Sequence, residues 1–597
     1  MCLIVIVIYM GAVQSGVWEA LSTNGAESYY NLLAQGFHTG QLSLKKDVPV
    51  GFRKLADPYD PVANARYRAY PYRLHDLSYY KGQLYLYFGI TPAVMLFWPF
   101  VAATGRCVFE RQAAVIFDGI GFLISVGLVH AMWRRYFAEV SSGVVAGCVL
   151  ALGLATGAPV MLTRCEVYEV AISCGYMFTM LALAAIWCAL HKPEQRCRWL
   201  AAASLAYGLA VGARPSLLFG GVVLLVPAAQ AWRERRNVRG ALWAALGPIG
   251  VIGVGLMAYN TLRFDNPFEF GWHYQLAIRQ QVTGDYFRLR YLWFNSWIYL
   301  LAPVHWSAQF PFVDSLTTLP PVNGGHRWVE RTFGVLINTP VVGLALAAPL
   351  AWRGRPGRET SSLRWFVMGA GVLLATCAVS VSLLPDAYLR YEAEFLPALV
   401  FVAVVGILGL ERVASSHSLR RKMIRSSWCL VLAYSVAFNL LASVEQCAVA
   451  HNSFGIGLVQ LGRLDDAIGQ YERALQIKPD FAEAQNNLGN VLAQLGSLRE
   501  AVAHYEQAIR LKTDYAEGHN DLAVALMGLG RFEEAIAHGE EAVRIEPDYV
   551  EAQFNLGLAL EKAGRTTEAI GHYRTALKLE PDLIAANKAL VRLKDGQ

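Results

Sequence analysis

The stretch AEAQNNLGNVLAQLGSLREAVAHYEQAIRLKTDY, residues 482–515, decides the fold of the end of this chain, because its pattern returns every 34 residues. A helix–turn–helix unit of this length cannot bury its apolar face alone, so successive units must stack. We expect four units, at 448–481, 482–515, 516–549 and 550–583, followed by a capping helix. A glycine, two alanines and usually a proline keep one phase through them: Gly462, Gly496, Gly530, Gly564; Ala467, Ala501, Ala535, Ala569; Ala474, Ala508, Ala542, Ala576; Pro479, Pro547, Pro581, with Thr513 in the remaining slot.

This pattern resembles that of tetratricopeptide repeats and assigns residues 447–597 to an α-solenoid. The resemblance implies a concave groove that takes a protein or peptide partner, and no catalytic residue is expected there. Two adjacent registers of the first helices carry a polar ladder that would hydrogen-bond an extended peptide, as in the similar repeats of O-GlcNAc transferase. The alternative is that the ladder satisfies carbonyl groups of neighbouring helices. Its members are Asn452, Asn486, Asn520 and Asn487, Asp521, Asn555.

The rest of the chain, residues 1–446, has the opposite character. The repeat region holds 22 acidic and 15 basic residues, which leaves a net charge of +13 in front of it, since the whole chain carries +6. The front is also strongly apolar, because the whole chain is 55% hydrophobic despite its polar end. Long uncharged runs indicate membrane spans, and basic residues that lie in short clusters between such runs argue against a nucleic-acid partner.

Basic clusters alternate with loops that hold a single arginine, and this alternation orients the spans. Clusters of Lys and Arg lie on the cytoplasmic side, so the single-arginine turns lie outside. The sequence therefore predicts an all-α protein with about eleven spans, a cytoplasmic N-terminus, outer loops at 19–112 and 263–334, and an array outside the cell or in the periplasm. The segment 84–103 is expected to be a helix that lies along the outer surface. The spans are placed near 1–18, 113–133, 142–162, 167–190, 199–213, 215–231, 240–262, 335–352, 365–384, 395–411 and 428–444.

Ionisable residues gather at the predicted outer boundary, where unpaired charges are costly and are functional candidates by default. The first outer loop contains Asn24-Gly25-Ala26-Glu27-Ser28-Tyr29-Tyr30 and later His75-Asp76. Glu166 and Glu169 lie in the turn after the third span. Arg214, Arg263 and Arg390 stand at other exits from the membrane.

These features resemble the GT-C superfamily of integral-membrane glycosyltransferases, which includes protein O-mannosyltransferases and bacterial aminoarabinose transferases. The resemblance rests on the acidic-Ser-Tyr-Tyr segment at Glu27, on Asp76 ahead of a surface segment, and on Glu166 or Glu169. It implies transfer of a sugar from a polyprenyl-phosphate carrier in the cell membrane to an acceptor on the outer face. The paired acids usual in the family are broken here by Ala26. Either Glu27 takes over that role or the site is inactive.

Inverting transfer needs a carboxylate to accept the proton of the acceptor and cations to offset charge on the leaving phosphate. Glu27, Asp76, Glu166 and Glu169 are the candidate acids, and His75 with Asp76 is a candidate pair for a divalent metal. The lipid phosphate would be bound by arginines, whose planar fork of donors suits it: Arg214, Arg263 and Arg390.

Simpler roles are open for several of these residues. Glu27 could cap the helix that follows it, Glu169 could pair with Arg164, and Arg214 could anchor the chain at the interface. Two other functions are therefore kept open. One is an O-antigen ligase or polymerase, and the other is a membrane scaffold without catalysis, in which the repeats alone recruit a partner.

Overall fold

The computed structural model describes residues 1–14, 27–68, 72–164, 167–277, 287–314, 328–329, 333–414 and 418–595, and it gives residues 358–359 and 594–595 as backbone only. The chain divides into two compact units, Met1–Cys447 and Ala448–Gln597. Ala26 and Glu166 lie outside the described residues.

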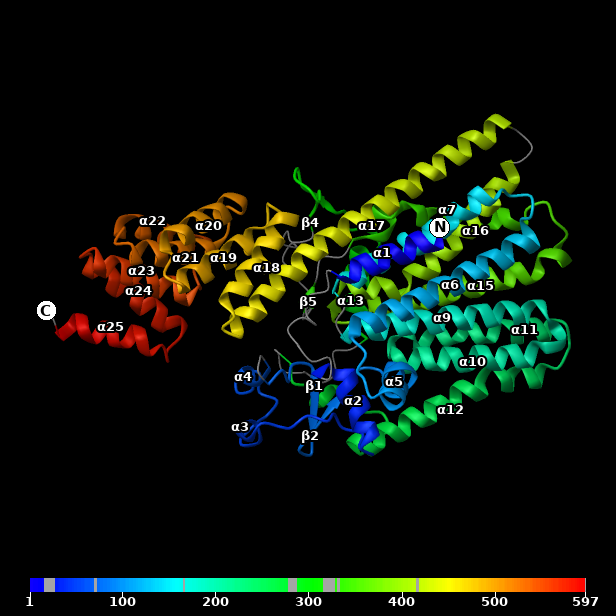
Figure 1. Ribbon diagram of the computed structural model, residues 1–597, viewed down its shortest axis with the longest axis horizontal. Helices are drawn as coiled ribbons and strands as arrows, with labels where there is room; N and C mark the ends of the chain where they lie inside the picture. The colour runs from blue at the N-terminus through cyan, green and yellow to red at the C-terminus, as the bar shows by residue number, and fades with distance from the viewer. Residues whose placement is uncertain are drawn as a thin grey trace. The chain divides into compact units, whose positions relative to one another are not determined.

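The first unit is a bundle of apolar helices (Figure 1). Its longer helices are α1 (Cys2–Gln14), α6 (Glu110–Tyr136), α7 (Ser142–Leu154), α8 (Ala158–Arg164), α9 (Val167–His191), α10 (Arg196–Ala213), α11 (Leu225–Arg233), α12 (Val238–Phe264), α13 (Leu289–Leu301), α15 (Gly357–Ser382), α16 (Leu396–Val413) and α17 (Ser418–Gln460), with the 3-10 segments η5 (Pro215–Leu224) and η7 (Pro340–Trp352). Shorter helical pieces are α2 (Tyr29–His38), α3 (Val50–Arg53), α4 (Ala65–Arg68), η3 (Ala93–Phe97), α5 (Trp98–Thr104), η4 (Pro193–Gln195), η6 (Trp272–Tyr274), α14 (Val335–Asn338) and η8 (Leu389–Glu394).

Helix covers the described part of each of the eleven segments that the sequence marks as spans. Among the described residues, eight helices are long and apolar enough to cross a bilayer. Shorter apolar helices lie at Cys2–Val13, Ala93–Thr104 and Pro340–Trp352. The segment 84–103 differs from the expected helix, because it begins as a strand that ends at Leu86 and becomes helical only at Thr91, with Pro92 in the first turn. Proline fits the first turn of a helix, where its missing N–H has no partner to lose.

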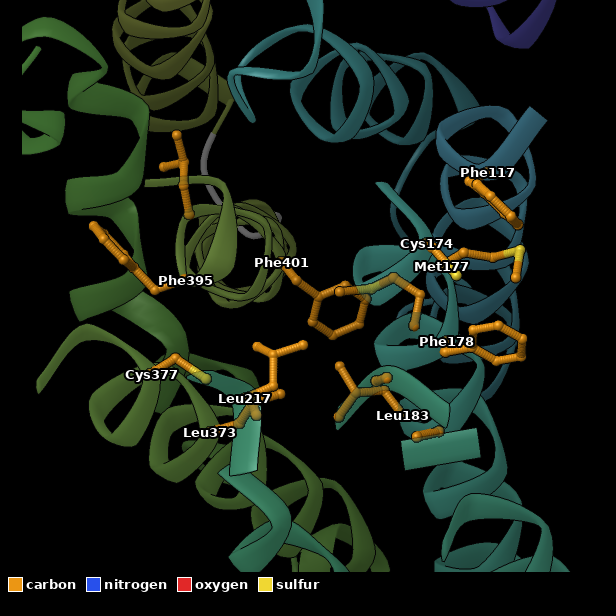
Figure 2. Packing of buried hydrophobic residues seen from close by; sticks show 14 of the residues in the cluster. Phe117, Cys174, Met177, Phe178, Leu183, Leu217, Leu373, Cys377, Phe395 and Phe401 are labelled. Carbon is orange, nitrogen blue, oxygen red and sulfur yellow. The ribbon is translucent and has the colours of Figure 1, made fainter. Parts of the chain in front are cut away.

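The core of the first unit lies where α9, η5, α15 and α16 meet. Figure 2 shows Phe401 of α16 among side chains of the other three elements, including Met177, Leu217 and Leu373, and all four residues are buried. Close packing continues between α16 and η7, where a Cβ at Gly406 would overlap the carbonyl of Leu344. Only glycine lets these two backbones come so near.

Strands occupy little of the described chain and pair in twos. β1 (Leu77–Tyr80) and β2 (Gln83–Leu86) form an antiparallel hairpin, β3 (His305–Trp306) pairs with β4 (Val313–Asp314), and β5 (Trp328–Val329) runs parallel to β6 (Asp386–Ala387). Asp76, one of the candidate acids, stands immediately before the first hairpin.

The second unit is a stack of helix pairs (Figure 1). Each first helix ends at a glycine with left-handed backbone, such as Gly496 at φ 85°, a conformation that glycine adopts without steric cost. After the end of α17, the helices are α18 (Leu464–Ile477), α19 (Ala482–Gln494), α20 (Leu498–Leu511), α21 (Ala516–Gly528), α22 (Phe532–Ile545), α23 (Val550–Lys562), α24 (Thr566–Leu579) and the terminal α25 (Ile584–Asp595).

Candidate functional site

Asp76 is the point at which three distant segments of the first unit meet. Its Oδ1 accepts a hydrogen bond of 2.7 Å from Nε2 of Gln275, and its Oδ2 accepts one from the hydroxyl of Tyr168. Nε2 of His75 lies 3.3 Å from Oδ2. The side chain of Asp76 is 13% exposed and that of His75 is 44% exposed. The carboxylate is therefore held by fixed donors, with one side open toward His75.

The backbone fixes Asp76 as firmly as its side chain does. Its φ is 59°, in the left-handed region, which Asp and Asn tolerate better than most residues. Its N–H donates to the carbonyl of Leu276 at 3.1 Å, and the N–H of Leu276 donates to Leu77 at 2.8 Å. The second outer loop is thus bonded to the start of the hairpin, which explains how Gln275 reaches the carboxylate.

Arg390 brings positive charge to the same place. Its guanidinium lies 4.0 Å from the ring centre of Tyr168 and 4.1 Å from that of Tyr388. Tyr168 therefore contacts both the carboxylate of Asp76 and the cation. Stacking of this kind covers the faces of a guanidinium, while its N–H donors point outward from the edge.

The environment changes the acidity of Asp76. Burial raises the pKa of this carboxyl above its usual 3.8, while His75 and then Arg390 act in the opposite direction by favouring the charged form. Because burial prevails, the carboxylate binds a proton more readily than an exposed aspartate does. This is the change that a proton acceptor working near neutral pH requires.

Glu27 lies near this site without entering it. The residue is exposed, and its charge favours the charged form of Lys46. The connection to Asp76 runs instead through Tyr29, whose hydroxyl donates to the carbonyl of His75 at 2.7 Å and to that of Arg73 at 3.1 Å. Helix α2 begins at Tyr29 with Ser28 as its N-cap residue, so Glu27 is not the cap.

Glu169 takes a different position from the other acids. It is 1% exposed and belongs to the first turn of α9, directly after Tyr168. Its partner Glu166 cannot be placed, since it is outside the described residues. Within this turn, Tyr168, which lies between the two acids in the sequence, is the residue that contacts Asp76.

Arg214, Arg263 and Arg390, the three candidate phosphate ligands, have different partners in the structure. Arg214 forms a buried ion pair with Glu394, and its Nε lies 3.0 Å from Oε1. Arg263 donates to the carbonyl of Leu86 at 2.7 Å and to Oδ1 of Asn260 at 2.8 Å. Of the three, Arg390 is the one whose charge reaches Asp76.

Two narrow cavities adjoin η8, the segment that carries Arg390. One of about 20 Å³ lies between η8 and α17 and is lined by apolar groups with Glu392 and Asn439. Another of about 20 Å³ lies next to Arg214 and Glu394. Each has room for about one water molecule. In the part of the chain that the structure describes, no group of three or more His, Cys, Asp or Glu residues could hold a metal ion. A divalent metal at His75 and Asp76 stays a prediction.

The side chains of the polar ladder in the second unit form hydrogen bonds with one another. Asn487 donates to Oδ1 of Asn452 at 3.0 Å, and Asn555 donates to Oδ1 of Asn520 at 2.9 Å. Each bond joins residues 35 positions apart, and therefore links one repeat to the next. One row of the ladder is buried and consists of Asn452, Asn486 and Asn520. The other row is half-buried and consists of Asn487, Asp521 and Asn555.

Asn486 completes this pattern by donating to Oδ2 of Asp521 at 2.9 Å. The ladder therefore stabilises the interfaces between repeats, and only its half-buried row is accessible to a ligand. These bonds join side chains of neighbouring repeats, a role that neither sequence interpretation included. Binding of a peptide by the ladder stays a prediction.

Residues that the sequence did not single out complete the candidate site. Gln275 belongs to a loop without any local signal, and Tyr388 resembles the many aromatic residues of an interfacial belt. Glu394 has no local signal that separates it from nearby Glu392, although it is the partner of Arg214. A search for tyrosines beside acidic residues at the ends of spans would have found Tyr168 and no other of these.

Comparisons with known proteins concern the second unit. A family model described as TPR repeat matches residues 458–496 and 489–530, and one described as tetratricopeptide repeat matches residues 519–584. The chain is similar to the crystal structure of MamA, with 26% identity, 22% of this chain and 78% of that chain covered, and a TM-score of 0.22. No curated protein matches the chain.

Two further solved structures cover similar parts of the chain. The Arabidopsis OM64 TPR domain is 31% identical over 19% of this chain and 94% of that chain, with a TM-score of 0.19. The first TPR of Spaghetti (RPAP3), bound to the HSP90 peptide SRMEEVD, is 23% identical over 19% of this chain and 91% of that chain, with a TM-score of 0.19. On the family matches, the C-terminal unit consists of tetratricopeptide repeats, a type of domain that binds protein or peptide partners.

Proposed function

We propose that the first unit is a polytopic membrane glycosyltransferase that takes a sugar from a polyprenyl-phosphate carrier and transfers it to an acceptor on the outer face of the membrane. The observation that carries the proposal is the convergence of Asp76 and Arg390, a partly buried acid and a buried cation, on one point from separate outer segments. Paired groups of this kind are what a reaction needs that takes one proton from the acceptor and releases a phosphate as the leaving group.

Membrane insertion is supported by the eight long apolar helices found among the described residues. In the proposed topology, Asp76, Arg390 and the turn before α9 lie together at the outer boundary. The basic clusters of the loops lie at the opposite boundary. A donor carried by a membrane lipid would meet the site from the bilayer, and the acceptor would come from outside.

The chemistry assigned to each group is simple. The acceptor oxygen attacks the anomeric carbon of the sugar, and its proton passes to the carboxylate of Asp76. The bond between that carbon and the phosphate oxygen breaks, and polyprenyl phosphate leaves as an anion. Arg390 offsets the charge that develops on this phosphate. Tyr168 and Gln275 position the carboxylate, and Arg214 and Arg263 hold the surrounding backbone.

The repeat array is proposed to recruit a protein, either the acceptor itself or an assembly partner. The half-buried row Asn487, Asp521 and Asn555 would contribute hydrogen bonds along the groove. This part of the proposal joins the two units in function and makes no assumption about how they are arranged in space.

The test is release of polyprenyl phosphate by the purified full chain, supplied with a panel of polyprenyl-phosphate sugars and with membrane extract as acceptor. Asp76→Asn should lower release by about 10²–10⁴-fold, the usual contribution of a general base. Asparagine has the same shape and tolerates the left-handed backbone. Its carbonyl oxygen can accept the bond from Gln275, and its NH2 group can donate to the hydroxyl of Tyr168, so the variant should fold. Asp60→Asn is the matched control, because Asp60 lies in the same outer loop and only accepts a turn bond from Val62.

The pH profile gives a second readout. Only the ionised form of Asp76 accepts a proton, and its pKa is raised above 3.8. Release should therefore rise with pH through a pKa above 3.8 and be lost below it. Wild-type turnover in Asp76→Asn would refute the assignment. If no sugar donor is consumed while a protein partner still binds the array, the scaffold function replaces the transferase.

A further inference from the structure

Four helix ends meet around a hollow at the end of the bundle formed by α9–α12. Helices α9 and α11 end there at His191 and Arg233, and helices α10 and α12 begin there at Arg196 and Val238. The hollow measures about 530 Å³ and is lined by residues 193–198 together with Arg236 and Asn237. We call it the arginine hollow.

Positive charge dominates this region. The two connecting segments, residues 192–198 and 233–239, contain seven basic and two acidic residues. Both acids are already engaged, since Glu234 pairs with Arg196 at 2.7 Å and Glu194 pairs with Arg236 at 2.5 Å. Five positive charges are therefore left without an acid in these two segments, and Arg198 on the wall of the hollow is exposed.

The helix ends add to this field. The N-terminus of a helix carries unpaired N–H groups and partial positive charge, and it favours an acidic residue or an anion. Neither α10 nor α12 has an acid in its first turn. Arg196, Arg198 and Arg239 occupy these turns instead, which is unfavourable for an isolated helix. An anion in the arginine hollow would offset both the helix dipoles and the arginines.

Side-chain capping is weak at the start of both helices. The N-cap residue of α10, Gln195, makes no side-chain capping bond. Asn237 caps α12 through a single 3.3 Å bond from the N–H of Gly240. At the start of α10, the N–H of Arg196 already donates to the carbonyl of Pro193 in the preceding turn η4. The first turn of α12, a helix of 27 residues, is therefore the one that has N–H groups to offer to a ligand.

Tryptophans around the hollow indicate what carries the anion. Trp232 and Trp243 are 74% and 78% exposed, and the ammonium group of Lys192 lies 5.6 Å from the ring centre of Trp199. Exposed tryptophan beside basic residues is typical of the headgroup level of a membrane. The arginine hollow thus opens where lipid phosphates lie.

We propose that the arginine hollow binds the phosphate of an anionic phospholipid headgroup. Arg198 supplies charge-assisted hydrogen bonds, Arg236 offers the guanidinium N–H groups outside its contact with Glu194, and the first turn of α12 supplies backbone N–H groups. Basic pockets between the ends of membrane helices are suited to such headgroups. The proposal does not depend on glycosyl transfer, because the hollow involves none of the residues around Asp76.

The experiment uses the purified full chain in a neutral detergent. Binding of phosphatidylglycerol, of phosphatidylethanolamine and of glycerol 3-phosphate is measured by native mass spectrometry and by the shift of the thermal unfolding temperature. Phosphatidylglycerol should bind and raise that temperature, and phosphatidylethanolamine should not. The double variant Arg198→Gln, Arg236→Gln should weaken phosphatidylglycerol by about tenfold or more for each arginine, as expected for hydrogen bonds to a charged group.

Control variants separate the hollow from general charge attraction. Arg198 is exposed, and the side chains of Arg236 and Glu194 are 52% and 77% exposed, so the double variant should fold. Arg134→Gln removes an exposed arginine at the end of α6, away from the hollow, and should leave binding unchanged. Equal binding of glycerol 3-phosphate would identify a soluble phosphate as the ligand of the same site. Equal losses in Arg134→Gln and the double variant, or no loss in either, would overturn the proposal.

Discussion

Three of the four repeats pack a glycine of the first helix directly against a tyrosine ring of the second. A Cβ built on Gly489 would lie 2.7 Å from Cε1 and 2.9 Å from Cδ1 of Tyr505. Carbon atoms in good contact are about 3.5–4.0 Å apart. Gly489→Ala therefore forces the ring, the helix or both to move by close to 1 Å, and we predict that it destabilises the array.

The ring has little freedom to move. Tyr505 is 2% exposed, and its hydroxyl donates to Oδ1 of Asn490 at 2.6 Å. Overpacking a well-filled core costs about 1–3 kcal/mol. Alanine regains up to about 1 kcal/mol through its better helix propensity. The net loss in the free energy of unfolding should be about 1–2 kcal/mol.

The same substitution at Gly571 should change the free energy of unfolding in the opposite direction. Gly571 lies within α24, is exposed, and has no atom within 4 Å of the Cβ that alanine would add. Here the helix propensity acts alone, so Gly571→Ala should stabilise the array by about 0.5–1 kcal/mol. The pair of variants thus isolates packing from backbone entropy, because the chemical change is identical.

The assay is urea unfolding of residues 448–597, the second compact unit, followed by far-ultraviolet circular dichroism. The midpoint should move down for Gly489→Ala and up for Gly571→Ala, with unchanged slopes, which would exclude a change in the denatured state. If Gly489→Ala raises the midpoint as much as Gly571→Ala does, the tight packing inferred at Tyr505 is wrong.

The remaining predictions concern both units. In the third repeat, Gly539 replaces the tyrosine and Ala523 the opposing glycine. Gly539→Tyr should therefore lower the unfolding midpoint. Adding Ala523→Gly should restore about 0.5–3 kcal/mol of the free energy of unfolding, measured as the coupling energy of a double-mutant cycle. Arg214→Gln leaves a glutamate with a 2% exposed side chain unpaired and should cost about 3–5 kcal/mol, seen as a lower unfolding temperature of the full chain in detergent. Burial and His538 lower the pKa of His519 below 6.5, so the unfolded array binds more protons and stability falls as pH drops below 6.5. His519→Gln recreates the Gln–His pair of the second and fourth repeats and should make the unfolding midpoint less sensitive to pH in that range. An unchanged sensitivity would contradict this prediction.

The repeats show how far periodicity alone leads. Their helix pairs follow from a phase of 34 residues, and even the exception in the third repeat is visible in the sequence, since Gly539 and Ala523 change together there. The bonds of the polar ladder are a different matter. Asn487 and Asn452 are 35 positions apart, and which amide faces which depends on the rotation between neighbouring repeats. That rotation is a property of packing, so the sequence predicted the register of the ladder and not its partners.

The candidate site shows the limit more sharply. Arg214 and Arg390 are alike in the sequence, since each is an isolated arginine at the end of an apolar run. Their roles divide only because Glu394 pairs with the first, while the second lies beside Asp76. Neither contact is local, and Gln275 reaches Asp76 across 199 positions of the chain. Sequence patterns predict on which face of a helix, or on which side of a membrane, a residue lies. They do not predict which of several equivalent residues contact one another in the folded protein.

One short segment connects stability with the proposed chemistry. η8 carries Arg390 near its start and Glu394 at its end. Since Glu394 is bound to Arg214, the ion pair fixes the end of the segment whose other end presents Arg390 to Asp76. Loss of Arg214 should therefore affect the position of Arg390 as well as the free energy of unfolding. An arginine that never contacts the lipid phosphate would then still be needed for its recognition, which is why a loss of transfer in an Arg214 variant cannot by itself identify Arg214 as a phosphate ligand.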